Sequence, residues 1–83
     1  MNIRVRYFAS LVDYSSDVRT ESLSVPEGAT VAEVKIALGK CYPELIPLLE
    51  IALALVNRHY VFAGEQPLHD GDEVDLLPPI SGG

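Results

Sequence analysis

One strong helix signal lies in the middle of this sequence, and it limits the folds that so short a chain can adopt. Residues 30–33, TVAE, match a capping box, in which the Thr30 side chain accepts a hydrogen bond from the Glu33 amide and Glu33 returns the bond. Apolar side chains then recur at helical spacing and should face a sheet: Val31, Val34, Leu38 and Cys41. Pro43 ends the helix.

Strand signals lie on both sides of this helix. They occupy residues 2–9, 19–25, 52–56, a very short segment around 60–61, and 73–77. Turn signals separate them at 26–28, 57–58 and 70–72, and residues 43–51 have room for a second short helical turn. We expect the segment 52–56, ALALV, to be a buried strand. The simplest packing is an α+β fold, a mixed sheet of four to five strands on one main helix.

The first and last strands are expected to lie side by side and parallel. This placement makes a match that a structure can test, because charged side chains on the outer face would then pair: Arg4 and Arg6 beside Glu73 and Asp75. It also brings Phe8 close to Leu77 at one end of the sheet, both facing solvent. An exposed apolar spot of this kind indicates a docking surface.

Size and charge narrow the partners. A chain of 83 residues forms one domain with a thin core. It has 12 acidic and 6 basic residues, a net charge of −6, and no cluster of lysines or arginines. Nucleic acids and anionic membranes are therefore poor partners, and a protein with a basic groove fits better. The start lacks a signal-peptide pattern and the apolar run 51–56 is too short to span a bilayer, so we expect a soluble cytoplasmic protein.

The sequence ends in LPPISGG, and this tail is the strongest functional candidate. Pro78 and Pro79 favour an extended, stiff stalk. Gly82 and Gly83 have no Cβ, so a narrow channel can close around their backbone. The six residues 78–83 reach roughly 20 Å at about 3.3 Å each. A stiff base and a thin tip predict a tail that inserts into a partner.

Four segments give the sequence a family resemblance: RYFA, VPEGATVAEV, DGDEV and PPISGG. Together they resemble the ubiquitin-like β-grasp sulfur carriers, most closely the small subunits of molybdopterin synthases. The resemblance implies a β-grasp domain at residues 1–77 and a tail at residues 78–83. In this family a ubiquitin-activating-like adenylyltransferase uses ATP to adenylate the terminal glycine, here Gly83, and a sulfur donor protein then converts it to a thiocarboxylate.

The resemblance also implies a partner and a division of labour. The large synthase subunit would take in the tail residues Pro78, Pro79, Ile80, Ser81 and Gly82 and use the sulfur on Gly83 to build the dithiolene of molybdopterin. Phe8, Tyr60 and Leu77 would lie on the face that meets this subunit, in an assembly of two small and two large subunits. The chain would bind no cofactor of its own and would not be a catalyst alone.

Other interpretations remain open at the level of sequence. A carrier for thiazole, tungsten cofactor or cysteine synthesis would use the same tail chemistry, although thiazole carriers tend to lack the PP stalk. A protein modifier would join lysines through Gly83, and a plain interaction domain would not need the tail. Cys41 is expected to pack in the core, and the only cysteine cannot form an intrachain disulfide. His59, His69 and the acidic turn 70–73 lack the spacing of a metal site.

Overall fold

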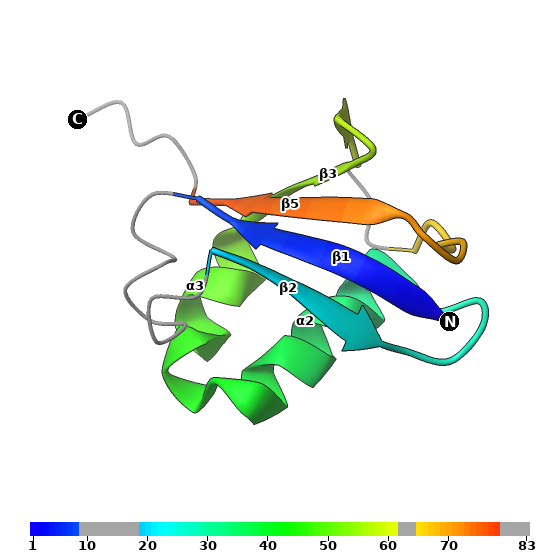
Figure 1. The fold of residues 1–83 in the computed structure, drawn as a ribbon. Helices are drawn as coiled ribbons and strands as arrows, with labels where there is room; N and C mark the ends of the chain where they lie inside the picture. The colour runs from blue at the N-terminus through cyan, green and yellow to red at the C-terminus, as the bar shows by residue number, and fades with distance from the viewer. Residues whose placement is uncertain (9–18, 62–64, 79–83) are drawn as a thin grey trace.

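A mixed β-sheet with helices on one face makes up the described part of the chain (Figure 1). The computed structural model describes residues 1–8, 19–61 and 65–78. Within them the strands are β1 (Asn2–Tyr7), β2 (Thr20–Ser24), β3 (Leu53–Val56), β4 (His59–Tyr60) and β5 (Glu73–Leu77). The helices are α2 (Val31–Cys41), the 3-10 turn η1 (Pro43–Leu45) and α3 (Ile46–Ile51).

The five described strands have the order β2-β1-β5-β3-β4, so the first and last strands in sequence are neighbours in the middle of the sheet. β1 and β5 are parallel, whereas β1–β2, β3–β5 and β3–β4 are antiparallel. Arg4 pairs with Glu73 and Arg6 with Asp75, which confirms the predicted register. The predicted α+β mixed sheet is therefore confirmed.

The main helix begins where its capping signal lies. Thr30 Oγ1 accepts a hydrogen bond from the Glu33 N–H at 3.3 Å, and the Thr30 hydroxyl donates back to Glu33 Oε1, also at 3.3 Å. The predicted return contact is therefore made between the Glu33 carboxylate and the Thr30 hydroxyl. α2 ends at Cys41, where the Tyr42 N–H bonds the Leu38 carbonyl at 2.8 Å. The following proline begins η1 and prevents α2 from continuing.

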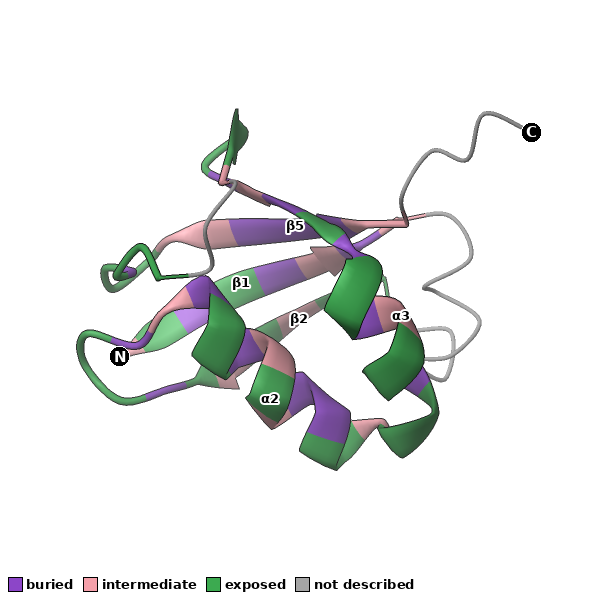
Figure 2. Cartoon of the chain, turned by 180° about the vertical axis from the view of Figure 1, so that it is seen from behind, coloured by how far each residue is buried: buried purple, intermediate pink, exposed green. Residues whose placement is uncertain are grey.

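The core lies between the sheet and the helices, as the buried segments in Figure 2 show. Its largest fully buried side chains come from both layers: Ile3, Val5, Val74 and Leu76 from the sheet, and Val31, Val34, Leu38 and Leu45 from the helices. Gly39 is also buried, and a Cβ at this position would come within 2.9 Å of Ile46 Cγ1. The glycine therefore allows α2 and α3 to approach closely.

Three predictions about local structure need correction. Cys41 is exposed and does not pack in the core. Tyr42, the next residue, takes the last position of the apolar stripe and packs on the core instead. Residues 43–51 form η1 and α3, considerably more than one helical turn. β3 is not uniformly buried, because Leu53 is exposed and Leu55 is half-buried while their neighbours Ala54 and Val56 are buried.

A shared carboxylate fastens the end of α2 to the sheet. Glu21 Oε2 accepts hydrogen bonds from the Tyr7 hydroxyl at 2.9 Å and from the Tyr42 hydroxyl at 2.7 Å. The two phenol rings meet edge to face, with centroids 6.2 Å apart. The bond to Glu21, assisted by burial, raises the pKa of Tyr42 to about 12. Burial, followed by the bond to Glu21, raises the pKa of Tyr7 still further.

Candidate functional site

An apolar patch lies on the sheet face that the helices leave uncovered. Alternation along β1 turns Tyr7 into the core and Phe8, the next residue, toward the open face. On β5 and β3, Leu77 is paired with Leu53, and on β3 and β4, Leu55 is paired with Tyr60. We call these five residues the open-face patch: Phe8, Leu53, Leu55, Tyr60 and Leu77.

Two of the three predicted contact residues, Phe8 and Leu77, are neighbours in the structure. The Phe8 N–H donates to the Leu76 carbonyl at 3.1 Å, so Phe8 lies next to the end of β5 and to Leu77. Tyr60 is three strand spacings away from β1, or roughly 14 Å at about 4.8 Å per spacing. Leu53 and Leu55 on β3 fill this interval. Sequence reasoning missed both of them, and they make the three predicted residues one continuous patch.

Two residues of the patch are exposed and the other three are half-buried. Tyr60 has 57% of its surface exposed and Leu53 has 36%. Large apolar side chains with this much exposure, gathered on one face, are typical of a protein-binding surface. The roles predicted for Phe8, Tyr60 and Leu77 in binding a partner stay predictions, since no partner chain is present.

A charged cluster lies within the same face. Arg6 Nη1 bonds Glu73 Oε1 at 3.1 Å, and Arg6 Nε lies 3.5 Å from Asp75 Oδ1. The Arg6 guanidinium also lies over the Phe8 ring, 4.9 Å from its centroid, which is within the range of a cation–π contact. Arg6 therefore links the two carboxylates to the aromatic member of the open-face patch.

Asp75 is the least solvated member of this cluster. It is 6% exposed, and its Oδ1 atom makes no hydrogen bond within the described residues. The 3.5 Å separation from Arg6 Nε is an ion-pair distance, too long for a strong hydrogen bond. Burial raises the pKa of Asp75 above its ordinary value, with Glu73 adding to the effect and Arg6 opposing it.

The predicted tail begins beside the open-face patch. β5 ends at Leu77, a patch residue, and the half-buried Pro78 follows it. Pro79, Ile80, Ser81, Gly82 and Gly83 lie outside the described residues, so their predicted roles stay predictions. What the structure does establish is where β5 ends: it is the central one of the described strands, and its last residue, Leu77, belongs to the patch.

Comparison with known proteins supplies a family for this arrangement. A model described as the ThiS family matches residues 5–83. The chain belongs to the ThiS family. It is 32% identical, over 83 residues, to the molybdopterin synthase sulfur carrier subunit of Homo sapiens, an alignment that covers 98% of this chain and 93% of the human protein. The resemblance inferred from the sequence is thereby confirmed at the level of the family.

Solved structures share the fold of this ThiS-family chain. The small archaeal modifier protein 1 of Haloferax volcanii matches with a TM-score of 0.83 and 26% identity, covering 95% of this chain and 98% of that one. A complex of subunits 1 and 2 of the molybdopterin-converting factor from Helicobacter pylori contains a chain that matches with a TM-score of 0.72 and 25% identity, with full coverage of both chains. The predicted ubiquitin-like β-grasp fold is confirmed.

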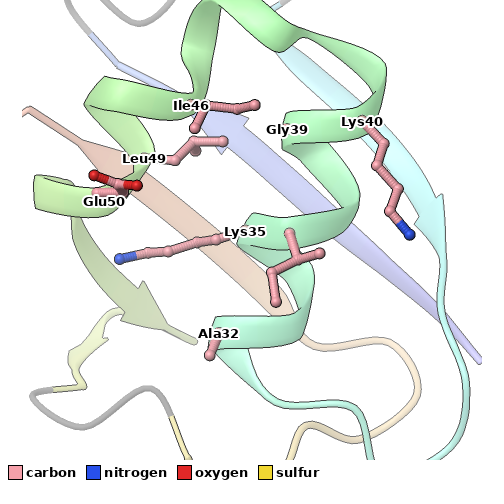
Figure 3. A pocket seen from close by; sticks show the side chains of 8 residues that line it. Ala32, Lys35, Gly39, Lys40, Ile46, Leu49 and Glu50 are labelled. Carbon is pink, nitrogen blue, oxygen red and sulfur yellow. The ribbon is translucent and has the colours of Figure 1, made fainter.

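A second apolar feature of the ThiS-family chain lies on its helix side. A hollow of about 450 Å³ opens between α2 and α3, and Figure 3 shows it between the two helices. Its lining is Ala32, Lys35, Ile36, Gly39, Lys40, Ile46, Leu49 and Glu50. Lys35 Nζ donates to the Ala52 carbonyl at 3.0 Å, and burial lowers the pKa of Lys35. The hollow lies on the helix side of the sheet, opposite the open-face patch.

Metal-ligating groups do not gather in the part of the chain that the structure describes. There, no three His, Cys, Asp or Glu side chains lie close enough together to hold a metal ion. The acidic turn before β5 uses its carboxylates locally: Asp70 Oδ1 accepts from the Asn2 N–H at 2.7 Å, and Asp72 Oδ2 accepts from the His69 N–H at 2.8 Å. None of the described helices has both the length and the apolar character needed to cross a membrane.

Proposed function

We propose that this ThiS-family chain is a sulfur carrier, and that a thiocarboxylate on Gly83 supplies sulfur for the dithiolene of molybdopterin. In this role the chain would be the small subunit of a two-protein molybdopterin synthase. The observation that carries the proposal is the open-face patch at the point where the tail leaves β5. The family match and the human sulfur carrier subunit support it.

The proposed chemistry requires an activated terminus. A carboxylate is a poor acyl donor because oxide is a poor leaving group. An adenylyltransferase partner would join the Gly83 carboxylate to the α-phosphate of ATP and release pyrophosphate. A persulfide on a donor protein would then attack the carbonyl carbon and displace AMP, which gives an acyl disulfide. A second thiol would attack the sulfur of the donor and form a disulfide with it, and the thiocarboxylate on Gly83 would be the leaving group. Because activation consumes ATP, we place the reaction in the cytoplasm.

The folded body contributes position to this chemistry. β5 is hydrogen-bonded on both sides, to β1 and to β3, so its last residue, Leu77, from which the proposed tail starts, is held in the sheet. The large subunit would dock on the open-face patch and receive the tail in a pocket that excludes water, which protects the thiocarboxylate from hydrolysis. The catalytic side chains of the synthase would then lie on the large subunit.

A second candidate function is attachment of this chain to other proteins through Gly83. The match to the small archaeal modifier protein 1 of Haloferax volcanii favours it, since that protein is named as a modifier. The two functions share the activated terminus and differ in what attacks it. A lysine amine would form a stable conjugate, whereas a sulfur donor would form the thiocarboxylate.

Intact-mass spectrometry distinguishes these functions. The chain is incubated with an extract of its own cells, ATP and a sulfur source, and its last peptide is then mapped. We expect a mass change equal to replacement of one oxygen by sulfur, located at Gly83. Conjugates of higher mass without this change would instead support the modifier.

A chain lacking Gly83 and a chain with a C-terminal tag should both fold and fail to support molybdopterin formation, while an N-terminal tag should be tolerated. Full activity of either altered C-terminus would refute the proposal.

A further inference from the structure

We infer that Asp75, in the centre of the open face, receives a cationic side chain from the partner protein that covers the open-face patch. This inference rests on the proposed function for the existence of that partner. It adds a chemical requirement: the apolar surface of the partner must carry an arginine or lysine opposite Asp75. The feature that carries it is a nearly buried carboxylate that lacks a hydrogen bond on one oxygen.

Asp75 lies in the middle of the face by the register of the sheet. Across the strands its neighbours are Arg6 on β1 and Leu55 on β3. Along β5, Glu73 and Leu77 share its side of the sheet, because side chains two residues apart point the same way. A surface that covers the open-face patch will therefore cover Asp75. Residues near the centre of an interface are the ones on which affinity depends most.

The charges in close contact do not balance. The ion pairs join a single cation, Arg6, to two carboxylates, Glu73 and Asp75. Arg4 lies across the strands from Glu73 and not from Asp75. Arg6 makes its short contact, 3.1 Å, with Glu73 and leaves Asp75 at 3.5 Å. Arg58 attracts Asp75 only from a longer range, from the exposed turn between β3 and β4. Asp75 is thus the carboxylate with the weaker compensation.

Docking would raise the energetic cost of the weakly compensated Asp75 carboxylate unless the partner supplies a positive charge. In the free chain, the Arg6 and Glu73 side chains are 32% and 27% exposed, so water still screens the cluster. A partner that covers Phe8, Leu55 and Leu77 removes this water. An uncompensated carboxylate in a dry interface is strongly unfavourable, and an incoming cation removes the penalty. Asp75 Oδ1 is covered in the free chain, so the cation of the partner must reach the carboxylate through the small part of Asp75 that is still exposed, while Arg6 stays in place.

The direction in which one substitution changes the binding affinity tests the inference. Asp75→Asn keeps the shape of the side chain and removes its charge. If the partner supplies a cation, Asp75→Asn should weaken binding to the large synthase subunit by about tenfold or more, and should lower the dependence of affinity on salt. If the partner supplies none, the substitution removes a desolvation penalty, and binding should stay equal or become tighter.

Glu44→Gln is the matched control. It makes the same change in net charge at an exposed residue of η1, on the helix side of the molecule. It should leave the affinity within about twofold of wild type, because only long-range steering changes. Thermal unfolding of Asp75→Asn confirms that the variant is folded, since loss of a poorly compensated charge should not destabilise the domain.

The outcomes separate the two levels of the argument. If the wild-type chain itself does not bind the large subunit, the proposed function fails and the inference fails with it. If wild type binds and Asp75→Asn binds as tightly or more tightly, the inference alone is overturned. If Glu44→Gln weakens binding as much as Asp75→Asn, the effect comes from total charge, and the inference is again overturned.

Discussion

Replacing Tyr60 by alanine tests whether a partner binds the open-face patch or other exposed apolar residues of this protein. Tyr60 lies on β4, the outer strand of the patch, and has 57% of its surface exposed. Ile36 on α2 is similarly exposed, at 62%, but lines the hollow on the helix side. Tyr60 and Ile36 therefore have similar exposed fractions but lie on different faces of the molecule.

The expected magnitude follows from the exposed surface. Aromatic side chains bury about 150–250 Å² when fully covered. The exposed 57% of Tyr60 thus corresponds to roughly 85–140 Å² that a partner can cover. At about 25 cal/mol per Å², its burial contributes about 2–3.5 kcal/mol, of which alanine keeps a small part. Tyr60→Ala should weaken binding by about 30- to 100-fold, since each 1.4 kcal/mol is tenfold.

The assay is calorimetric titration of the large synthase subunit with wild type, Tyr60→Ala, Tyr60→Phe and Ile36→Ala. Tyr60→Phe keeps the ring area and removes the hydroxyl, so it should bind within a few-fold of wild type. Ile36→Ala should bind as wild type does. Unfolding in denaturant shows whether each variant keeps its stability, so that loss of fold is not counted as loss of affinity.

Two results would contradict this reasoning. Equal affinity of Tyr60→Ala and wild type would show that the partner does not cover β4. A large loss for Ile36→Ala would place the partner on the helix side, over the hollow between α2 and α3. Either result would require a different docking face, even if the terminal chemistry at Gly83 were demonstrated.

Further predictions concern the folded body. Thr30→Ala should lower the free energy of unfolding by about 1 kcal/mol in denaturant titrations, because the cap of α2 is lost. Tyr42→Phe should lower it by about 1–2 kcal/mol, because the phenol donates to the Glu21 carboxylate. The pKa of Tyr42 is raised to about 12 in the fold, so this stabilisation is complete below pH 10 and is lost as pH rises toward 12. The stability difference between wild type and Tyr42→Phe should accordingly shrink between pH 10 and pH 12, as measured by unfolding, and a constant difference would contradict the assignment. Cys41 is exposed, so it should react fully with a thiol reagent without denaturant, and a protected thiol would place it back in the core.

Long-range pairing was predictable here because the residues carried a second signal besides alternation. The predicted placement of residues 2–7 beside residues 73–77 put opposite charges on their outer faces next to each other, and the structure has that register. The capping box likewise placed the start of α2 correctly, since capping depends only on residues close in sequence. Both signals are nearly independent of how the rest of the chain packs.

Packing between layers decided the features that the sequence did not reveal. ALALV has only apolar residues, so its two faces could not be told apart before the helix layer was known. In the structure the small Ala54 lies on the helix side, where space is limited, and the larger Leu53 and Leu55 face outward. At the end of α2, Tyr42 packs against the core and its hydroxyl donates to the Glu21 carboxylate, whereas Cys41 is exposed. No local pattern encodes either choice.

The position of β5 has a consequence for the way this molecule is made in a cell. β5 joins the β1–β2 pair to the β3–β4 pair, yet it is the last of these strands to leave the ribosome. An incomplete chain therefore holds two separate ribbons, each too small to be stable by itself. Only a polypeptide translated past residue 77 can assemble the sheet. Prematurely terminated products therefore lack the strand that joins the two halves of the sheet.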